Sequence, residues 1–263
     1  MRFFFIGFGA FFKGVKFSIS KLGIWYIVPI FLWLILFVVL SLELSEWAIS
    51  ILYETIESLT GISMSSEASD SDWLEILKTG IHWGFILVIK LFVWYILGRY
   101  MKYLILILLA PLFAYLSEKT EELVAGKIYP FSLIQFIKDI LRGVGITFRN
   151  MFIESFIILV ASIIGFIFPI ISPILLILLF FLNSYFMAFN FFDYVVERKR
   201  MNIGKSVRYM RANAMTLIGF GTAYNIVSWI PLLDWVLAPI SATAGAVLAD
   251  RDLPEGKNST SFI

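Results

Sequence analysis

The sequence predicts an all-α integral membrane protein with two long transmembrane helices, two proline-broken hairpins that penetrate the bilayer part-way, and amphipathic helices at its surface. Three observations predict this class. First, 60% of the 263 residues are hydrophobic and the mean hydropathy is +0.90. Second, the stretch 155–192 runs for 38 residues without a charged side chain. Third, the stretch 212–249 has the same length and one charge, Asp234. Apolar runs of this length, without strand-like alternation, are typical of helices in a bilayer.

The stretch 155–192 predicts a hairpin rather than a single helix. One α-helix of this length would extend about 57 Å, well beyond the hydrocarbon core of about 30 Å. Pro169 and Pro173 lie near its centre and break such a helix. Only two isoleucines and Ser172 separate these prolines, whereas a turn in water normally carries Gly, Asn or Asp. We therefore expect the tip to stay within the bilayer or just under its far interface.

The distribution of charge predicts the orientation of the chain. Four basic residues precede the first acidic residue, Glu43, and the segment from Glu43 to Glu75 has eight carboxylates and no Lys or Arg. Because Lys and Arg mark the cytoplasmic side, we expect a cytoplasmic N-terminus and an external acidic segment. Basic residues flank both 38-residue stretches, which places the feet of both hairpins in the cytoplasm. A multi-pass protein of the bacterial inner (plasma) membrane is the predicted location.

These signals predict one membrane domain, residues 1–252, followed by a disordered tail, residues 253–263. In chain order, we expect an interfacial helix at 1–20, a first spanning helix at 22–60, an external acidic loop at 61–72, a second spanning helix at 73–110, a cytoplasmic-side turn and amphipathic helix at 111–149, a first hairpin at 151–196, a basic helix at 197–211 and a second hairpin at 212–250.

The interfacial helices are predicted from amphipathic patterns. At the N-terminus, Arg2 and a phenylalanine-rich run suggest a signal peptide, but Lys13 and Lys16 follow at once and no small-residue cleavage site is present. The pattern therefore indicates a retained helix in the interface. The segment 130–149 has apolar residues at helical spacing with charged residues between them. This favours a helix on the cytoplasmic face.

Two polar residues interrupt the second spanning segment. Lys90 lies in the middle of the apolar run, where a charge is costly and often functional. It either belongs to a transport pathway or extends to the interface or a carboxylate. His82 lies near the expected outer interface, where water can hydrate its side chain, so its presence requires no functional role.

The composition excludes several kinds of chemistry. Cysteine is absent and His82 is the only histidine, so neither thiol chemistry nor a His- or Cys-based metal site is expected. No phosphate-binding loop, dinucleotide fingerprint or nucleophile elbow occurs. Asp193 and Asp234 would form an acid dyad only if a hairpin foot met a hairpin tip. We therefore expect no enzyme activity and no cofactor, and the net charge of +2 predicts no nucleic-acid partner.

Three blocks carry a family resemblance. They are A-P-L-F-A-Y-L-S-E-K-T-E-E-L-V-A-G at 110–126, F-D-Y-V-V-E-R-K-R at 192–200 with the basic K-S-V-R-Y-M-R-A-N that follows, and G-F-G-T-A-Y-N-I-V-S-W-I-P-L-L-D-W-V-L-A-P-I-S-A-T-A-G-A at 219–246. The chain resembles the CysZ family of bacterial sulfate permeases, which is related to the etoposide-induced membrane protein. The positions that match the family motifs are Pro111, Phe113, Gly126, Asp193, Tyr194, Arg208, Arg211, Phe220, Gly221, Pro231, Pro239 and Gly245.

The resemblance implies a helical inner-membrane protein with hemi-penetrating hairpins that assembles as a homo-oligomer in the lipid bilayer. It also implies sulfate uptake, proton-linked or channel-like, for the synthesis of cysteine. Members of the family carry a G-L-R or G-L-R-R motif at the start of the first span, which holds the anion. Guanidinium groups and backbone N–H groups at a helix start suit a tetrahedral oxyanion.

The corresponding stretch here, K-L-G-I-W-Y-I-V-P at 21–29, departs from the family motif. Gly23 fits, but Trp25 and Tyr26 replace the arginines, and their N–H and O–H groups donate hydrogen bonds without supplying charge. Lys21, just before, compensates in part. An anion entrance formed by Lys21, Gly23, Trp25 and Tyr26 is therefore expected. A gating or packing network is expected at Glu118, Lys119, Glu121 and Lys90.

Two functions follow from this departure. The first is an anion permease or channel with sulfate as the default substrate. The alternative is a non-transporting structural or assembly protein that keeps the fold, because the two arginines of the motif are replaced.

Overall fold

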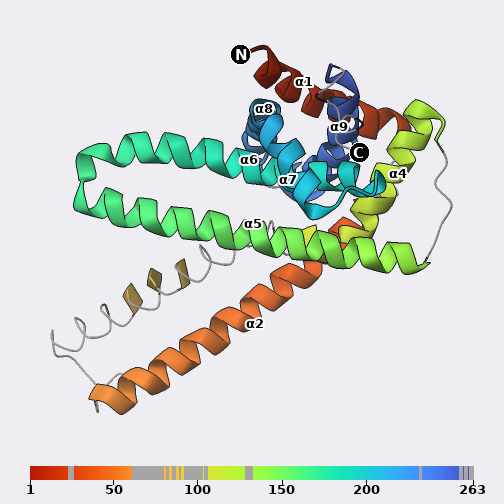
Figure 1. Ribbon diagram of the computed structural model, residues 1–263. Helices are drawn as coiled ribbons and strands as arrows, with labels where there is room; N and C mark the ends of the chain where they lie inside the picture. Colours follow the sequence, from red (N-terminus) through yellow and green to blue (C-terminus); the bar gives the residue numbers. More distant parts are fainter. Residues whose placement is uncertain are drawn as a thin grey trace. The chain divides into compact units, whose positions relative to one another are not determined.

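The computed structural model describes residues 1–22, 27–60, 106–127, 133–230 and 233–254, with single residues and pairs of residues between and after these ranges. The elements in these ranges are helices, and no described residue belongs to a strand (Figure 1). The all-α prediction is therefore confirmed. The chain divides into two units, one made of Leu32–Lys102 and the other of Met1–Phe31 with Tyr103–Ile263.

Most of helix α2 (Ile27–Thr60) belongs to the smaller unit. Its 34 residues give a length of about 51 Å. Pro29 lies in the first turn, where the missing N–H breaks no intrahelical hydrogen bond. Exposed side chains of α2 are apolar before Glu43, as at Val39, whereas beyond it exposed carboxylates such as Glu54 alternate with apolar residues such as Trp47. The predicted acidic loop 61–72 lies outside the described residues.

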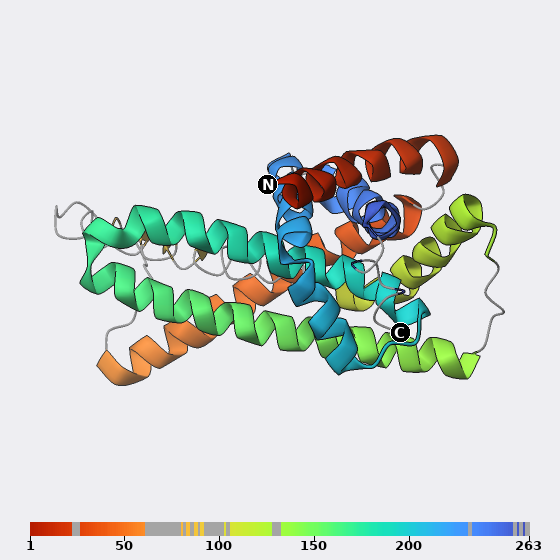
Figure 2. The same ribbon diagram turned by 45° about the horizontal axis from the view of Figure 1, so that its top comes forward.

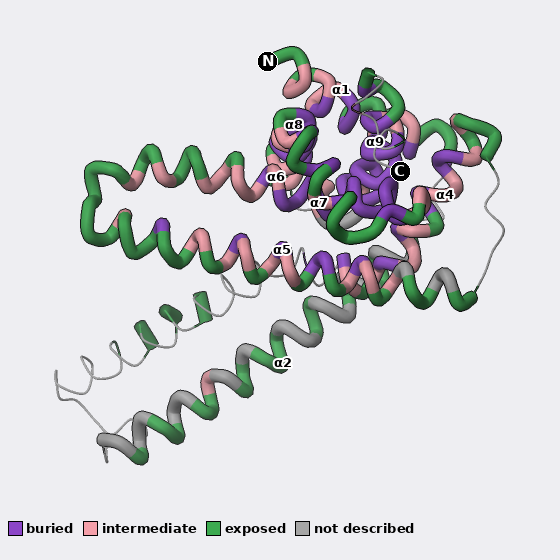
Figure 3. Tube along the Cα trace, viewed as in Figure 1, coloured by how far each residue is buried: buried purple, intermediate pink, exposed green. Residues whose placement is uncertain are grey.

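The core of the larger unit forms around helix α1 (Arg2–Phe17), which packs against α8 (Ala214–Val227) and α9 (Ala238–Asp252). In Figure 3 the buried residues gather where these helices meet. The Phe11 ring lies 5.7 Å from the Phe220 ring, edge to face. The helix expected at the membrane surface is thus a central part of this core, although its depth in a bilayer stays a prediction.

Glycines bring α1 this close to its neighbours. A Cβ atom on Gly7 would overlap the carbonyl group of Thr216 on α8, and one on Gly14 would overlap the backbone of α9 at Ser241 and Gly245. Small residues let helix backbones approach in this way, and membrane helices use them for the same purpose. The sequence therefore favours close packing of three short apolar helices.

A long hairpin extends from this core. Helix α5 (Leu133–Ile167) leads into the short 3₁₀ helix η3 (Pro169–Ile171), and α6 (Ser172–Arg198) returns beside α5 (Figures 1 and 2). The chain reverses at the prolines, as the sequence predicts. Ile170 at the tip is 92% exposed, which is consistent with a tip in lipid.

Helix α5 differs from expectation at its start. It runs without a break through Arg149, so the amphipathic helix predicted at 130–149 and the first arm of the hairpin share one continuous element. No proline interrupts the helix there, and Gly143 and Gly145 lie within it without breaking it. Three segments of the described chain are long and apolar enough to cross a membrane, namely Arg2–Leu22, Ile140–Ile167 and Pro169–Arg198.

The predicted second hairpin has a different design from the first. Helices α8 and α9 have only 14 and 15 residues, and each packs mainly on α1 instead of on the other. A π-helical turn, η4 (Leu233–Leu237), precedes α9. The many small residues of this segment explain the difference, because they fit between helices instead of forming an apolar face for lipid.

Two shorter helices complete the larger unit. Helix α4 (Ala110–Ala125) has Pro111 in its first turn and ends at Gly126, whose φ of +66° closes it as the sequence predicts. Helix α7 (Ile203–Ala212) begins after Asn202, whose side chain accepts a hydrogen bond of 2.8 Å from the Lys205 N–H.

Described residues of the tail 253–263 contact the core, while the disorder of this segment stays a prediction. Leu253 is buried, and the Lys257 ammonium lies 4.0 Å from the centre of the Phe3 ring. The carbonyl of Lys257 also accepts a hydrogen bond of 2.8 Å from the Asn213 amide. One apolar contact, one cation–π contact and one hydrogen bond therefore hold this segment.

Candidate functional site: a buried polar core at the base of the hairpin

Polar side chains line the inner faces of α5 and α6 where the hairpin joins the helical core. We call Arg142, Asn150 and Glu154 of α5, together with Asn183, Asn190 and Asp193 of α6, the polar core. The residues on each helix recur at intervals that keep them on the face toward the other helix. Four of the six side chains, Asn150, Glu154, Asn190 and Asp193, are buried. A buried polar face inside otherwise apolar membrane helices is costly, and such faces often serve function.

Glu154 is the deepest acidic residue of the polar core. Glu154 is 1% exposed and lies within the apolar segment Ile140–Ile167. The Tyr103 hydroxyl donates a hydrogen bond to Oε2, and the Asn183 amide donates to Oε1 at 2.7 Å. The Asn225 amide of α8 in turn donates to Asn183 Oδ1 at 3.0 Å. A chain of hydrogen bonds thus joins α5, α6 and α8 through this carboxyl group.

The rest of the polar core lies nearer the feet of the hairpin. Arg142 Nη2 lies 3.1 Å from Asp193 Oδ1 and donates to the Ser206 hydroxyl of α7 at 2.7 Å. The Asn150 amide donates to Asn190 Oδ1 at 2.8 Å. These contacts hold the two arms at a fixed register.

Two donors of the polar core remain available. Arg142 Nε and Asn190 Nδ2 are buried and meet no acceptor among the residues that the structure describes. A buried N–H without an acceptor costs about 1–3 kcal/mol, more for a charged group. Both groups donate hydrogen bonds and neither can accept one, so an anion is the ligand that their chemistry suits.

The end of α6 is fixed to two other helices by buried ion pairs. Arg198 Nη2 lies 3.3 Å from Glu121 Oε2 of α4, and Lys199 Nζ lies 2.8 Å from Asp250 Oδ2 of α9. The Tyr209 hydroxyl of α7 donates to the other oxygen of Asp250 at 2.8 Å. These contacts connect α4, α6, α7 and α9 just beyond the polar core.

The buried hydroxyl of Tyr209 is expected to make the free energy of unfolding depend on pH. Burial, and secondly the Asp250 carboxylate, raise the pKa of Tyr209 well above its usual 10.0. Because the unfolded chain releases this proton near pH 10 and the folded chain retains it, stability is intact below pH 10 and falls above it. We expect Tyr209→Phe to reduce the alkaline loss by about 1.4 kcal/mol per pH unit between these pKa values. Unfolding in detergent from pH 8 to 11 measures this, and an unchanged alkaline slope would contradict it.

The expected gating or packing network is distributed over different contacts. Lys119 pairs with Glu122 at 2.9 Å on the surface of α4, whereas Glu121 faces Arg198 and, at 4.0 Å, Lys127. Glu118 also lies on α4, while Lys90 belongs to the other unit, where it is helical and exposed. The structure therefore places Glu121 of this set next to the end of α6.

The expected anion entrance falls largely outside the described residues. Lys21 is exposed near the end of a π-helical segment, Ser18–Leu22. Gly23, Trp25 and Tyr26 lie outside the described residues, so the role of these positions stays a prediction. Pro231 of the third block is outside as well.

The other motif positions serve mainly as packing residues. Phe113 is fully buried and its ring lies 6.0 Å from that of Tyr194. Gly221 lets α8 approach Ser184 of α6, because a Cβ atom there would overlap that backbone. Phe220, Pro239 and Gly245 are buried between α1, α8 and α9, whereas Arg208 and Arg211 of α7 are exposed.

The two aspartates considered as a dyad have different partners. Asp193 faces Arg142, and Asp234 accepts a hydrogen bond of 3.3 Å from the Tyr224 hydroxyl. Apart from Asp193, the sequence predicts no functional role for the residues of the polar core. Its only sequence signal was the regular spacing of Asn183, Asn190 and Asp193 along an otherwise apolar helix.

The fold and the polar core define an all-α membrane protein with buried charged and amide side chains between the two arms of its hairpin. The family model described as "Sulfate transporter CysZ/Etoposide-induced protein 2.4" matches residues 10–239. Because the match covers most of the sequence, the chain belongs to this family. The matched residues include both arms of the hairpin and the whole polar core. A comparison with curated proteins finds no match.

Proposed function

We propose that this protein is an anion permease or channel of the bacterial inner membrane, with sulfate as its default substrate for cysteine synthesis. Membership of the sulfate-transporter family supports transport as the general role. The observation that carries the proposal is the pair of buried donors, Arg142 Nε and Asn190 Nδ2, without acceptors among the described residues. Sulfate offers four oxygens that accept hydrogen bonds from such groups.

The arrangement in the bilayer belongs to the same proposal. The N-terminus and the feet of the hairpin lie in the cytoplasm, and the hairpin tip stops within the membrane. Exposed apolar side chains along both arms, such as Phe156 and Leu176, suit contact with lipid and with further copies in a homo-oligomer. The polar core then lies near the cytoplasmic interface, where an anion released by the permease reaches water.

Uptake of labelled sulfate into liposomes tests the proposal. We expect the purified protein to exceed empty liposomes and Trp25→Arg to increase uptake severalfold, because it restores a cation at the family's anion motif. Asn190→Asp keeps an acceptor for Asn150 but replaces the free donor with a charge that repels anions. It is expected to lower uptake at least tenfold, since the loss of a charge-assisted hydrogen bond and the repulsion add together.

Asn202→Asp is the matched control. It makes the same substitution at the exposed N-cap of α7, where Asn and Asp are nearly equivalent, so uptake should not change. No uptake by either the unaltered protein or Trp25→Arg would contradict the sulfate assignment. Calorimetric titration with other oxyanions then separates a different substrate from the structural or assembly role. Sulfate-dependent growth of a deletion strain gives the physiological answer.

A further inference from the structure

Three arginines lie on the helices at the foot of the hairpin, one on α5 beside the polar core and two on α7. We call Arg149, Arg208 and Arg211 the foot arginines. Arg149 is half-buried on α5, and the other two are exposed on α7, which contains no acidic residue. The Arg142–Ser206 hydrogen bond of 2.7 Å holds α7 beside α5, and Figure 2 shows α7 next to the base of the hairpin.

The foot arginines differ from the neighbouring cations in their partners. Arg142, Arg198 and Lys199 each face a buried carboxylate. Among the described residues, in contrast, no carboxylate pairs with a foot arginine. Within the described part of the chain, Arg149 donates a hydrogen bond to the amide oxygen of Asn150, at 3.1 Å. The positive charge of this surface is therefore not neutralised by the described part of the chain.

Tyr185 of α6 completes the cluster. Its side chain is half-buried, and the charges of Arg211 and Arg149 both act on its hydroxyl. Two guanidinium groups, on α5 and α7, thus lie within electrostatic reach of one phenol on α6, and all three are hydrogen-bond donors. Guanidinium groups bind phosphate oxygens in pairs of hydrogen bonds, and a phenol adds a further donor.

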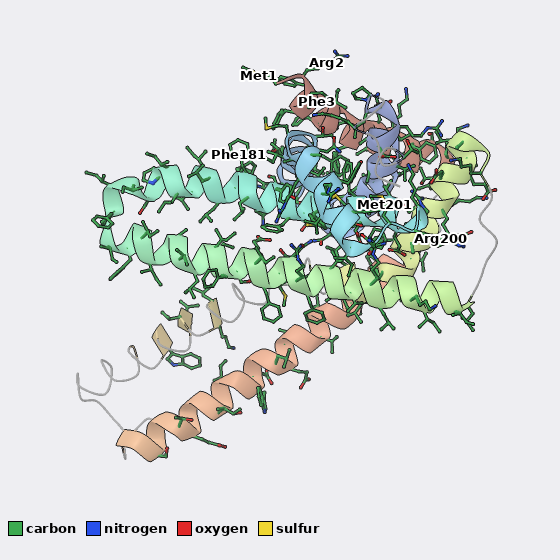
Figure 4. All side chains as sticks on the ribbon, viewed as in Figure 1. Met1, Arg2, Phe3, Phe181, Arg200 and Met201 are labelled. Atoms are coloured by element: carbon green, nitrogen blue, oxygen red, sulfur yellow. The ribbon has the colours of Figure 1, made fainter. Side chains whose placement is uncertain are left out.

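Exposed phenylalanines lie next to these residues along α5 and α6. Phe148 and Phe152 flank Arg149 on α5 and are 43% and 67% exposed. Phe181, labelled in Figure 4, lies one turn from Tyr185 on α6 and is also exposed. A charged cluster beside exposed aromatic rings at the start of an apolar helix is typical of the membrane interface. One ligand that is both anionic and apolar fits both parts.

We propose that the foot arginines and Tyr185 form a binding site for the headgroup of an anionic phospholipid, whose acyl chains lie along Phe152 and Phe181. A lipid is favoured over a free oxyanion because exposed arginines alone bind small anions weakly in water. The acyl chains add apolar contact, and basic groups between membrane helices on the cytoplasmic side bind such headgroups. This site uses side chains other than the sulfate-binding residues proposed above, although Arg149 contacts Asn150 of the polar core.

Native mass spectrometry of the detergent-solubilised protein tests the site. Phosphatidylglycerol is the probe and phosphatidylcholine the neutral comparison. We expect phosphatidylglycerol to bind preferentially, and Arg149→Gln with Arg211→Gln to weaken this binding about 30-fold, since each cation near an anionic lipid surface contributes roughly fivefold. Arg149→Lys with Arg211→Lys should restore most of the preference. Arg2→Gln with Arg251→Gln removes two exposed arginines elsewhere and should change nothing.

Two other results would contradict the proposed lipid site. Unchanged phosphatidylglycerol binding in the glutamine double variant would overturn the proposal. Thermal stabilisation by inorganic phosphate or sulfate that the double variant abolishes, without a lipid preference, would show a free-anion site instead. If the double variant fails to elute at the native size, Arg211→Gln alone replaces it, because this exposed side chain has no ion pair among the described residues.

Discussion

Gly7→Ala is expected to separate α1 from the rest of the core and to destabilise the protein by about 3 kcal/mol or more. The added methyl group would overlap the carbonyl of Thr216 and lie 2.9 Å from the Phe220 nitrogen. Both are backbone atoms of α8, so no side chain can turn aside to make room. Unfolding in detergent, followed by circular dichroism, measures the loss, and size-exclusion chromatography shows whether the fold survives.

Gly9→Ala on the same helix is the control. A Cβ atom on Gly9 meets nothing within 4 Å. Alanine is the better helix former by about 1 kcal/mol, so this variant should be as stable as the original or slightly more stable. Equal destabilisation by both substitutions would show that α1 tolerates no change in composition, and would contradict the close contact with α8.

Asp250→Asn is expected to destabilise the protein by about 3 kcal/mol. The substitution keeps the shape of the side chain but removes the charge that faces Lys199 at 2.8 Å. Both side chains are largely buried, and a buried cation deprived of its partner carries the full cost of desolvation. The unfolding free energy in detergent at neutral pH measures the effect.

Asp252→Asn, two residues further along α9, provides the comparison. Asp252 also pairs with a lysine, Lys13, but its side chain is 41% exposed and that of Lys13 is 61% exposed. Water and salt screen such a pair, so the loss should stay below about 1 kcal/mol. If the two variants lose equal stability, burial is not the source of the difference.

The local features of the fold could be predicted from the sequence. Prolines at 169 and 173 indicate where the hairpin reverses, and Gly126 indicates where α4 ends, because each residue acts through its own backbone. The uncharged stretch 155–192 predicts membrane helices for the same reason. These features depend on neighbours in sequence, which the sequence displays directly.

Features that depend on distant partners could not be predicted in this way. Glu154 precedes the uncharged stretch by one residue, and nothing local shows that it meets Asn183 and, through it, Asn225. The two 38-residue stretches have similar composition, yet only the first forms a long exposed hairpin. What distinguishes them is the partner: the glycines of α8 and α9 accept α1, a helix from the opposite end of the chain.

That partnership has a consequence for biosynthesis. Lys13 and Asp252 meet in the folded protein although they are 239 positions apart. At roughly 5–20 residues per second, α1 is made about 10 to 50 s before the helix against which it packs. The hairpin of α5 and α6, in contrast, can close as soon as its second arm is complete. The nascent chain therefore carries α1 without its packing neighbours until α8 and α9 have been made, and the core can assemble only after residues up to Asp252 have been synthesised.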